Sequence, residues 1–330
     1  MSPVDPDRVG ALLERVRGVR VLVVGDLMLD RYISGSVERV SPEAPVPVVR
    51  VESEREAVGG AGNVSANVTA LGGSCAVVGC VGADREGESL MQALAARGVA
   101  HHGVVRTPDR PTTVKTRVLA QHQQIVRFDR EVDAEAGPDL AARLADAVRR
   151  IASDCDVLIV QDYDKGVLAR PVIEAILEVT AARRISWIVD PKRRSFFEYP
   201  GATVFKPNAR ELGDALGAPI RPDDSGWMEA TRARLGCEHL LLTLGDRGMA
   251  LQTSGSALIR LPAVARDVYD VSGAGDTVTA AVALALAAGA TVAEAAELAN
   301  HAAAVEVAKS GVETVSPEEL RAHARTPRPS

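Results

Sequence analysis

The stretch DVSGAGDT, residues 270–277, places a glycine-rich turn between two aspartates and directly before a long alanine-rich segment. Gly273 and Gly275 have no side chain that would keep an anion away from the backbone. The segment after Thr277 is predicted to be a helix, and the first amides of a helix are unpaired and carry partial positive charge. The sequence therefore predicts an anion-binding turn with Asp276 beside it.

Asp276 has two interpretations. Aspartate is common near helix starts, so it could simply cap the helix. A cap does not require the preceding Gly273-Ala274-Gly275 turn, and this favours a general base beside a bound phosphate. Phosphoryl transfer needs donors that hold the moving group and a carboxylate that accepts the alcohol proton. The turn and Asp276 can supply both.

Six short runs rich in β-branched and apolar residues alternate with helical patterns along the chain. This alternation predicts an α/β fold with a mostly parallel sheet covered by helices on both faces. Ligands of such sheets bind at the carboxyl ends of the strands. The predicted strands are 19–26, 75–82, 156–162, 185–190, 203–208 and 239–245.

Two regions depart from this alternation of strands and helices. Residues 37–54 and 112–131 alternate polar and apolar side chains with no helix between them, which indicates antiparallel strands. We expect them to form a lid over the edge of the sheet, within segments of approximately 31–55 and 100–131. Ordinary surface hairpins are the alternative.

Charge and hydropathy argue against some classes of function. The net charge of −6, with no long basic run, argues against binding to nucleic acid. The longest uncharged run, 277–293, is mostly alanine and contains glycine, which predicts a buried helix and no membrane association. The N-terminus lacks the apolar core of a signal peptide, so a cytoplasmic location is expected.

Two glycine-rich segments together carry a family resemblance. VGGAGNVSANVTALGG (58–73) and DVSGAGDT resemble the two signatures of the ribokinase-like (PfkB) carbohydrate kinases, and VVGDLMLDRY (23–32), KPNARE (206–211) and LTLGDRGM (242–249) follow in family order. The resemblance implies one carbohydrate kinase domain over residues 1–330. It also implies a ribokinase-like three-layer sandwich with a small β-strand lid, and ATP and Mg²⁺ as cofactors.

Four further segments indicate a branch of that family: 39–51, 117–129, 161–168 and 189–196. They resemble the stand-alone heptose kinases of lipopolysaccharide core synthesis, which phosphorylate D-glycero-β-D-manno-heptose 7-phosphate at O1. The alternatives are another sugar or sugar-phosphate kinase, of the ribokinase or fructokinase type, and a non-catalytic sugar- or nucleotide-binding protein. Members of the family often pair through the lid, so the resemblance also implies a homodimer.

The resemblance assigns roles to individual residues. Asp276 corresponds to the catalytic base, and the amides of Gly273, Ala274 and Gly275 correspond to the anion hole. The expected sugar contacts are Asp26, Asp30, Gly59, Gly60 and Asn63, although a tight turn that caps the following helix would also explain the last three.

A substrate that already carries a phosphate needs cations. Lys165 and Lys192 each follow a strand end and are candidates for that phosphate or for the anomeric region, with Asp190 as a substrate contact; Arg117 and Arg127 are weaker candidates. For the nucleotide, the resemblance implies Lys206, Asn208, Glu211, Thr243, Gly245, Asn300 and Ala304, and Glu211 would also organise the magnesium ion, partly through water.

Overall fold

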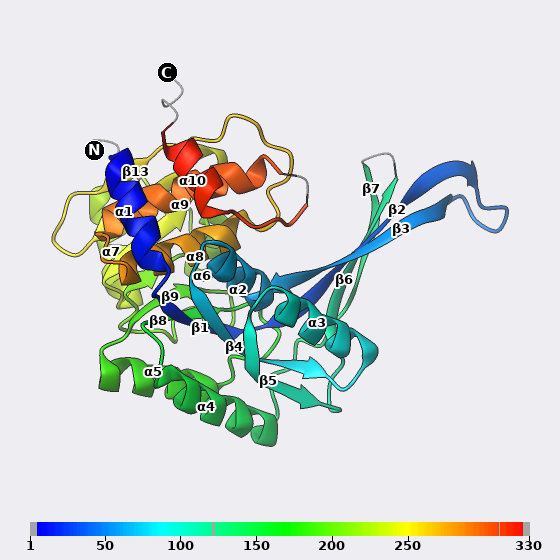
Figure 1. Cartoon of the computed structure of the whole chain (residues 1–330), viewed down its shortest axis with the longest axis horizontal. Coiled ribbons are helices and arrows are strands. Elements are labelled where there is room, and N and C mark those ends of the chain that lie inside the picture. The colour runs from blue at the N-terminus through cyan, green and yellow to red at the C-terminus, as the bar shows by residue number, and fades with distance from the viewer. Residues whose placement is uncertain (1–4, 121–122, 310, 326–330) are drawn as a thin grey trace.

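The computed structural model of the protein describes residues 5–120, 123–309 and 311–325. This part of the chain is built around a nine-stranded sheet with the strand order β13-β12-β11-β10-β9-β8-β1-β4-β5 (Figure 1). The strands from β5 to β11 in that order are parallel, whereas β12 and β13 are antiparallel to their neighbours. The strands are β1 (Arg20–Gly25), β4 (Ser74–Gly82), β5 (Ala100–Thr107), β8 (Val157–Gln161), β9 (Ser186–Asp190), β10 (Val204–Phe205), β11 (His239–Thr243), β12 (Met249–Thr253) and β13 (Ile259–Leu261).

Helices cover both faces of this sheet because its central strands are apolar on both sides. Alternate residues of a strand point to opposite faces. In β1, Val21 and Val23 enter one hydrophobic core, and Leu22 and Val24 enter the other. The first core is closed by α1 (Pro6–Val16), α2 (Ala61–Ala70), α3 (Arg85–Ala96), α8 (Ala274–Ala287), α9 (Val292–Val307) and α10 (Pro317–Ala324), and the second by α4 (Pro138–Ala152), α5 (Arg170–Arg183), α6 (Ala209–Leu216) and α7 (Ser225–Leu235).

The predicted three-layer α/β fold with a mostly parallel sheet is confirmed. Each of the six predicted strand runs contains a strand, although in the run 203–208 the strand covers only Val204–Phe205 and Asn208 adds an isolated bridge to Thr243. The uncharged run 277–293 begins inside α8, whose residues from Asp276 to Ala285 are buried against the core. No helix in the described ranges is long and apolar enough to cross a membrane.

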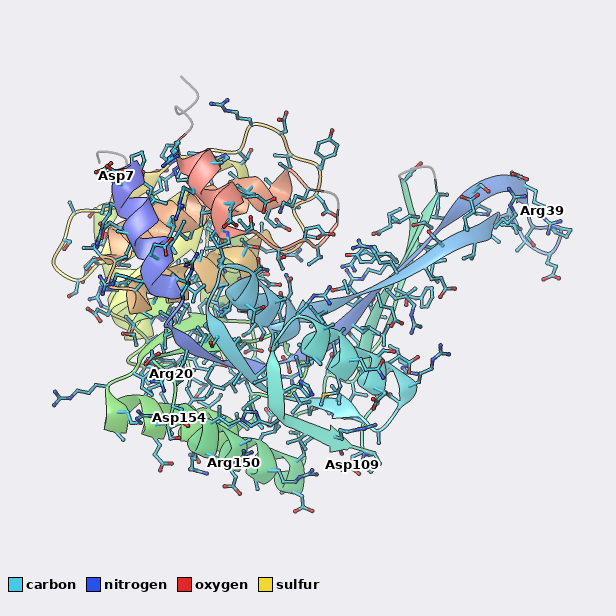
Figure 2. All side chains as sticks on the ribbon, in the orientation of Figure 1. Asp7, Arg20, Arg39, Asp109, Arg150 and Asp154 are labelled. Carbon is cyan, nitrogen blue, oxygen red and sulfur yellow. The ribbon has the colours of Figure 1, made fainter. Side chains whose placement is uncertain are left out.

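A second, four-stranded sheet, here called the lid sheet, extends from the sandwich as an arm (Figure 1). Arg39, labelled in Figure 2, lies toward its far end. Strands β2 and β6 pair in parallel at its centre, and β3 and β7 are antiparallel edge strands. The order β3-β2-β6-β7 is formed by β2 (Leu27–Val40), β3 (Pro47–Gly60), β6 (Thr113–Ala120) and β7 (Gln123–Arg130).

The lid sheet differs from the predicted lid segments at two boundaries. The hairpin of β2 and β3 runs from Leu27 to Gly60 and exceeds the predicted 31–55 at both ends. The prediction for 100–131 was wrong over its first eight residues, because Ala100–Thr107 pairs with β4 at the edge of the central sheet. Positions 121–122 of that segment lie outside the described residues.

Candidate active site

The glycine-rich turn forms the start of α8, as its sequence predicts. Gly273 is the residue that precedes the helix and has φ 98°, a conformation that L side chains rarely adopt. A Cβ atom at this position would also lie 3.0 Å from Glu306 Oε1 and 3.2 Å from Asn63 Nδ2. The close approach of two polar side chains and the positive φ therefore both require glycine here.

Asp276 lies in the first turn of α8 with 5% of its surface exposed. Its Oδ2 accepts a hydrogen bond from Asn63 Nδ2 at 2.8 Å. Its Oδ1 accepts two more, from the Tyr163 hydroxyl at 2.8 Å and from Gln161 Nε2 at 3.1 Å. Burial raises the pKa of Asp276 to about 6, against the lowering effect of the Asn63 and Tyr163 hydrogen bonds. The group is thus ionised at neutral pH and can still accept a proton.

Two lysines, Lys206 and Lys192, bring positive charge to the turn. Lys206, which is almost fully buried, pairs with Asp190 through Nζ and Oδ2 at 3.1 Å. A Cβ atom on Gly275 would lie 3.8 Å from Lys206 Nζ, so this ammonium group stands beside the turn. Both lysines line a polar cavity of about 170 Å³, whose wall is made by Tyr163, Asp190, Lys192, Lys206, Asn208, Glu211, Thr243, Gly273, Gly275 and Asp276.

A second cavity, of about 360 Å³, adjoins the polar one, and Asn208, Thr243 and Gly275 line both. Its surface is mostly apolar, and it includes the predicted nucleotide residues Gly245, Asn300 and Ala304. A polar compartment that opens into an apolar one suits a ligand with phosphates at one end and a planar base at the other. Five of the predicted nucleotide residues therefore come together: Asn208, Thr243, Gly245, Asn300 and Ala304.

Glu211 lies at the polar end with both carboxylate oxygens engaged. Its Oε2 accepts the Asn208 backbone N–H at 2.9 Å, and its Oε1 pairs with Lys192 Nζ. In return, Asn208 Oδ1 accepts the Glu211 N–H at 2.9 Å, which closes a capping box at the start of α6. In the described ranges, no group of three or more His, Cys, Asp or Glu side chains could hold a metal ion. Because both of its oxygens are already engaged, Glu211 fits a magnesium ion as an outer, water-mediated partner.

Asp26, a predicted sugar contact, has a different position. It is buried, and its carboxylate accepts the backbone N–H groups of Tyr163 at 2.8 Å, Lys165 at 3.0 Å and Val167 at 3.0 Å. Burial nevertheless raises the pKa of Asp26. These amides fix Asp26 against the loop that carries Tyr163, and its contact with the sugar stays a prediction.

Asp30 and the two glycines of the first signature lie together at the base of the lid sheet. Asp30 Oδ1 pairs with Arg117 Nη1. A Cβ atom on Gly59 would lie 2.2 Å from Asp30 Oδ2. Gly60 has φ 58° and directly precedes the first residue of α2. These glycines serve a tight strand-to-helix connection, while Asn63, three residues further along, reaches Asp276.

The structure separates the two lysines that were predicted to bind a phosphate. Lys192 Nζ lies over the Tyr163 ring, 5.1 Å from its centroid, and lines the polar cavity. Lys165 Nζ instead pairs with Glu131 at 2.9 Å and Asp133 at 2.6 Å. The two lysines thus have different partners, and phosphate binding by either of them stays a prediction.

Three residues at the site were not predicted from the sequence: Gln161, Tyr163 and Glu306. Gln161 and Tyr163 end β8 and begin the loop after it, so the rule that ligands bind at strand ends could have identified them. Glu306 lies near the end of α9 and has no such signal. It is fully buried, and neither of its carboxylate oxygens has a hydrogen-bond partner among the described residues. Burial, with Asp270 and Asp276 nearby, raises the pKa of Glu306 to about 8.

A family model described as pfkB family carbohydrate kinase matches residues 19–319. The chain belongs to this family. It is therefore a phosphotransferase that acts on sugars.

Two curated relatives are similar to the chain over most of its length. The chain is 44% identical to the bifunctional protein HldE of Pelobacter propionicus over 96% of its own length and 65% of the relative. It is 45% identical to the HldE of Rhodospirillum rubrum over 92% of its own length and 62% of the relative. The chain thus spans less than two thirds of these bifunctional proteins.

Solved structures support the ribokinase-like fold. The Arabidopsis thaliana ribokinase complexed with ribose and ATP superposes with a TM-score of 0.71 at 21% identity, covering 94% of this chain and all of that one. Phosphofructokinase-2 of Escherichia coli in complex with potassium superposes with a TM-score of 0.77 at 20% identity, covering 93% of this chain and 98% of that one.

Replacing Asp276 with asparagine tests the base. Asp276→Asn keeps the shape of the side chain but cannot accept a proton, so we expect kcat to fall by about 100- to 10,000-fold. ATP binding, measured by calorimetry, should persist. Asp146→Asn, at an exposed position on α4, is the matched control. Full turnover in Asp276→Asn would contradict the assignment.

The pH profile of kcat tests the environment of Asp276. With a pKa of about 6, the group must lose its proton to act as a base, so kcat should fall as the pH drops through that value. The Tyr163 hydroxyl lowers the pKa of Asp276 by donating a hydrogen bond. Tyr163→Phe should therefore move the acid limb of the profile to higher pH. An unchanged limb, or one at lower pH, would be inconsistent with this contact.

Glu306 should make stability depend on pH. The unfolded chain releases this proton near pH 4.5, whereas the folded protein holds it up to about pH 8. The folded state binds more protons between these values, so the free energy of unfolding falls as pH rises, by at most about 1.4 kcal/mol per pH unit.

Urea denaturation at pH 5 and pH 8 measures this effect. Glu306→Gln removes the titrating group and should lose less stability between the two pH values than the wild type. Glu174→Gln, at an exposed position on α5, is the control. Equal losses in wild type and Glu306→Gln would exclude the effect.

Proposed function

We propose that the protein transfers the terminal phosphate of ATP to O1 of D-glycero-β-D-manno-heptose 7-phosphate and produces the 1,7-bisphosphate. This product is a precursor of ADP-heptose and of the lipopolysaccharide core. The relatives named HldE and the four segments that resemble heptose kinases support this substrate. The observation that carries the proposal is the buried, hydrogen-bonded carboxylate of Asp276 beside a glycine turn at a helix start.

In this proposal the residues of the polar cavity divide the work. Asp276 accepts the proton of the sugar O1 as that oxygen attacks the terminal phosphorus of ATP. The backbone amides of Gly273, Ala274 and Gly275 hold the transferred phosphoryl oxygens, and each such donor contributes about 3 kcal/mol to transition-state stabilisation. Lys206, beside the turn, offsets the negative charge that gathers there.

The nucleotide occupies the two adjoining cavities. Its base lies in the apolar cavity near Asn300 and Ala304, and its phosphates point to Asn208 and Thr243. A magnesium ion bound with the phosphates would neutralise part of their charge. Glu211 would hold such an ion through water, because Lys192 and the Asn208 amide already engage its two oxygens.

The lid sheet supplies the surface for a homodimer. Large apolar side chains are exposed on its strands at Val40, Val51, Val126 and Phe128, and Val46 is exposed in the connection between β2 and β3. Its edge strands β3 and β7 also carry unpaired backbone groups, and such edges favour pairing with another chain. A cytoplasmic location fits substrates such as ATP and a sugar phosphate.

Another sugar kinase of the same family is the second candidate. The superposition on a ribokinase and on phosphofructokinase-2 shows a shared fold only, so it favours no particular sugar. A non-catalytic binding protein is disfavoured by the family's two glycine signatures and by the intact carboxylate at position 276.

A substrate panel tests the proposal. ADP release should be fastest with heptose 7-phosphate, compared with fructose 1-phosphate, fructose 6-phosphate and ribose. The Asp276→Asn variant gives the background rate. Activity on a fructose phosphate with none on the heptose would overturn the substrate, and no ADP release with any sugar would favour a binding protein.

A further inference from the structure

One face of the lid sheet is rich in charge. Strands β2, β6 and β7 place Asp30, Lys115 and Asp129 side by side in register. Two residues further along β6, Arg117 lies opposite Arg127. Since residues i and i+2 of a strand share a face, these side chains form one surface. This surface is directed at the candidate active site, because Lys115 Nζ lies over the Tyr163 ring, 5.2 Å from its centroid.

Most cations near this surface are neutralised by a carboxylate of the chain. Each of four basic side chains forms an ion pair: Arg117 with Asp30, Arg127 with Asp129, Lys165 with Glu131 and Asp133, and Lys192 with Glu211.

Lys115 differs from these four. It has no ion pair among the described residues, and it is half-buried. Burial lowers its pKa, although Asp30 acts in the opposite direction. A partly desolvated ammonium group that no carboxylate contacts directly is stabilised when a ligand supplies a negative charge beside it. The charges around the site therefore leave Lys115 as a position that favours an anion.

Tyr163 fixes where that anion would lie. Its hydroxyl donates to Asp276 Oδ1 at 2.8 Å, while its ring faces the ammonium groups of Lys115 and Lys192. The Tyr163 side chain thus lies between Lys115 and the Asp276 carboxylate. A sugar that presents its reacting hydroxyl to Asp276 would place its far end on the side of Tyr163 where Lys115 stands.

We propose that Lys115 binds the phosphate group that the sugar carries before the reaction and so selects sugar phosphates over free sugars. This inference rests on the proposed function. It transfers to Lys115 the part that the sequence analysis gave to Lys165, whose charge Glu131 and Asp133 already balance. Lys192 stays with Glu211 at the nucleotide end of the cavity.

Steady-state kinetics of Lys115→Met test the proposal. With heptose 7-phosphate, kcat/KM should fall by about 10- to 100-fold, mainly through a higher KM, because one charge-assisted contact is lost. With the same heptose lacking the phosphate, kcat/KM should stay within about twofold of the wild type. The KM for ATP should not change, and Lys115→Arg should restore part of the loss.

Control variants separate the proposal from general damage. Arg170→Met removes an exposed cation on α5 and should leave all constants unchanged. Equal losses on the phosphorylated and free heptose in Lys115→Met, or no loss on either, would overturn the inference. If Lys115→Met does not fold, Lys115→Gln gives the same decision: its KM should rise for heptose 7-phosphate alone, and an unchanged KM overturns the inference.

The wild type separates this inference from the proposed function. If it does not phosphorylate heptose 7-phosphate, the proposed function fails. Lys115 is then tested with fructose and fructose 6-phosphate, or with ribose and ribose 5-phosphate, whichever pair the enzyme accepts. A wild type that prefers the free sugar of that pair would overturn the role of Lys115.

Discussion

The buried carboxylate of Asp276 is the constraint around which the structure is organised. Asn63, 213 residues earlier in the chain, holds one of its oxygens, and Gln161 and Tyr163 hold the other. These contacts bring α2, the end of β8 and the start of α8 to one point. Burial and Asp190 favour the protonated form while the hydrogen bonds favour the ionised one, and the balance gives the base its pKa of about 6.

The parallel sheet delivers the remaining groups to the same place. Adjacent strands β9, β10 and β11 end at one edge, and Asp190, Lys206 and Thr243 lie at or just after those ends. The pair of Lys206 and Asp190 is buried, and a buried ion pair contributes little net stability because both charges lose their hydration. We therefore infer that this pair serves to hold the Lys206 ammonium group beside the glycine turn.

Much of this arrangement is predictable from the sequence because local rules determine it. The turn at Gly273 follows from glycine's tolerance of positive φ, and the three layers follow from apolar runs that alternate with helices. The edge strand Ala100–Thr107 is less predictable, because it contains adjacent histidines and an arginine and lacks the apolar pattern of the inner strands.

The electrostatic partners could not be predicted in the same way. A lysine after a strand end is visible in the sequence, but the carboxylates that neutralise Lys165 come from a different segment, residues 131–133. The partners of Asp26 could not be predicted for the same reason, because they are backbone amides of the loop after β8. Glu306 reaches Gly273 only because α9 packs against α8.

A crystal structure with the sugar phosphate, MgADP and aluminium fluoride, which imitates the transferring phosphoryl group, tests the central claim most directly. The account predicts fluoride ligands within hydrogen-bond distance of the backbone amides at residues 273–275, with the attacking sugar oxygen beside the Asp276 carboxylate. Aluminium fluoride bound away from this turn, or a sugar oxygen out of reach of Asp276, would contradict it.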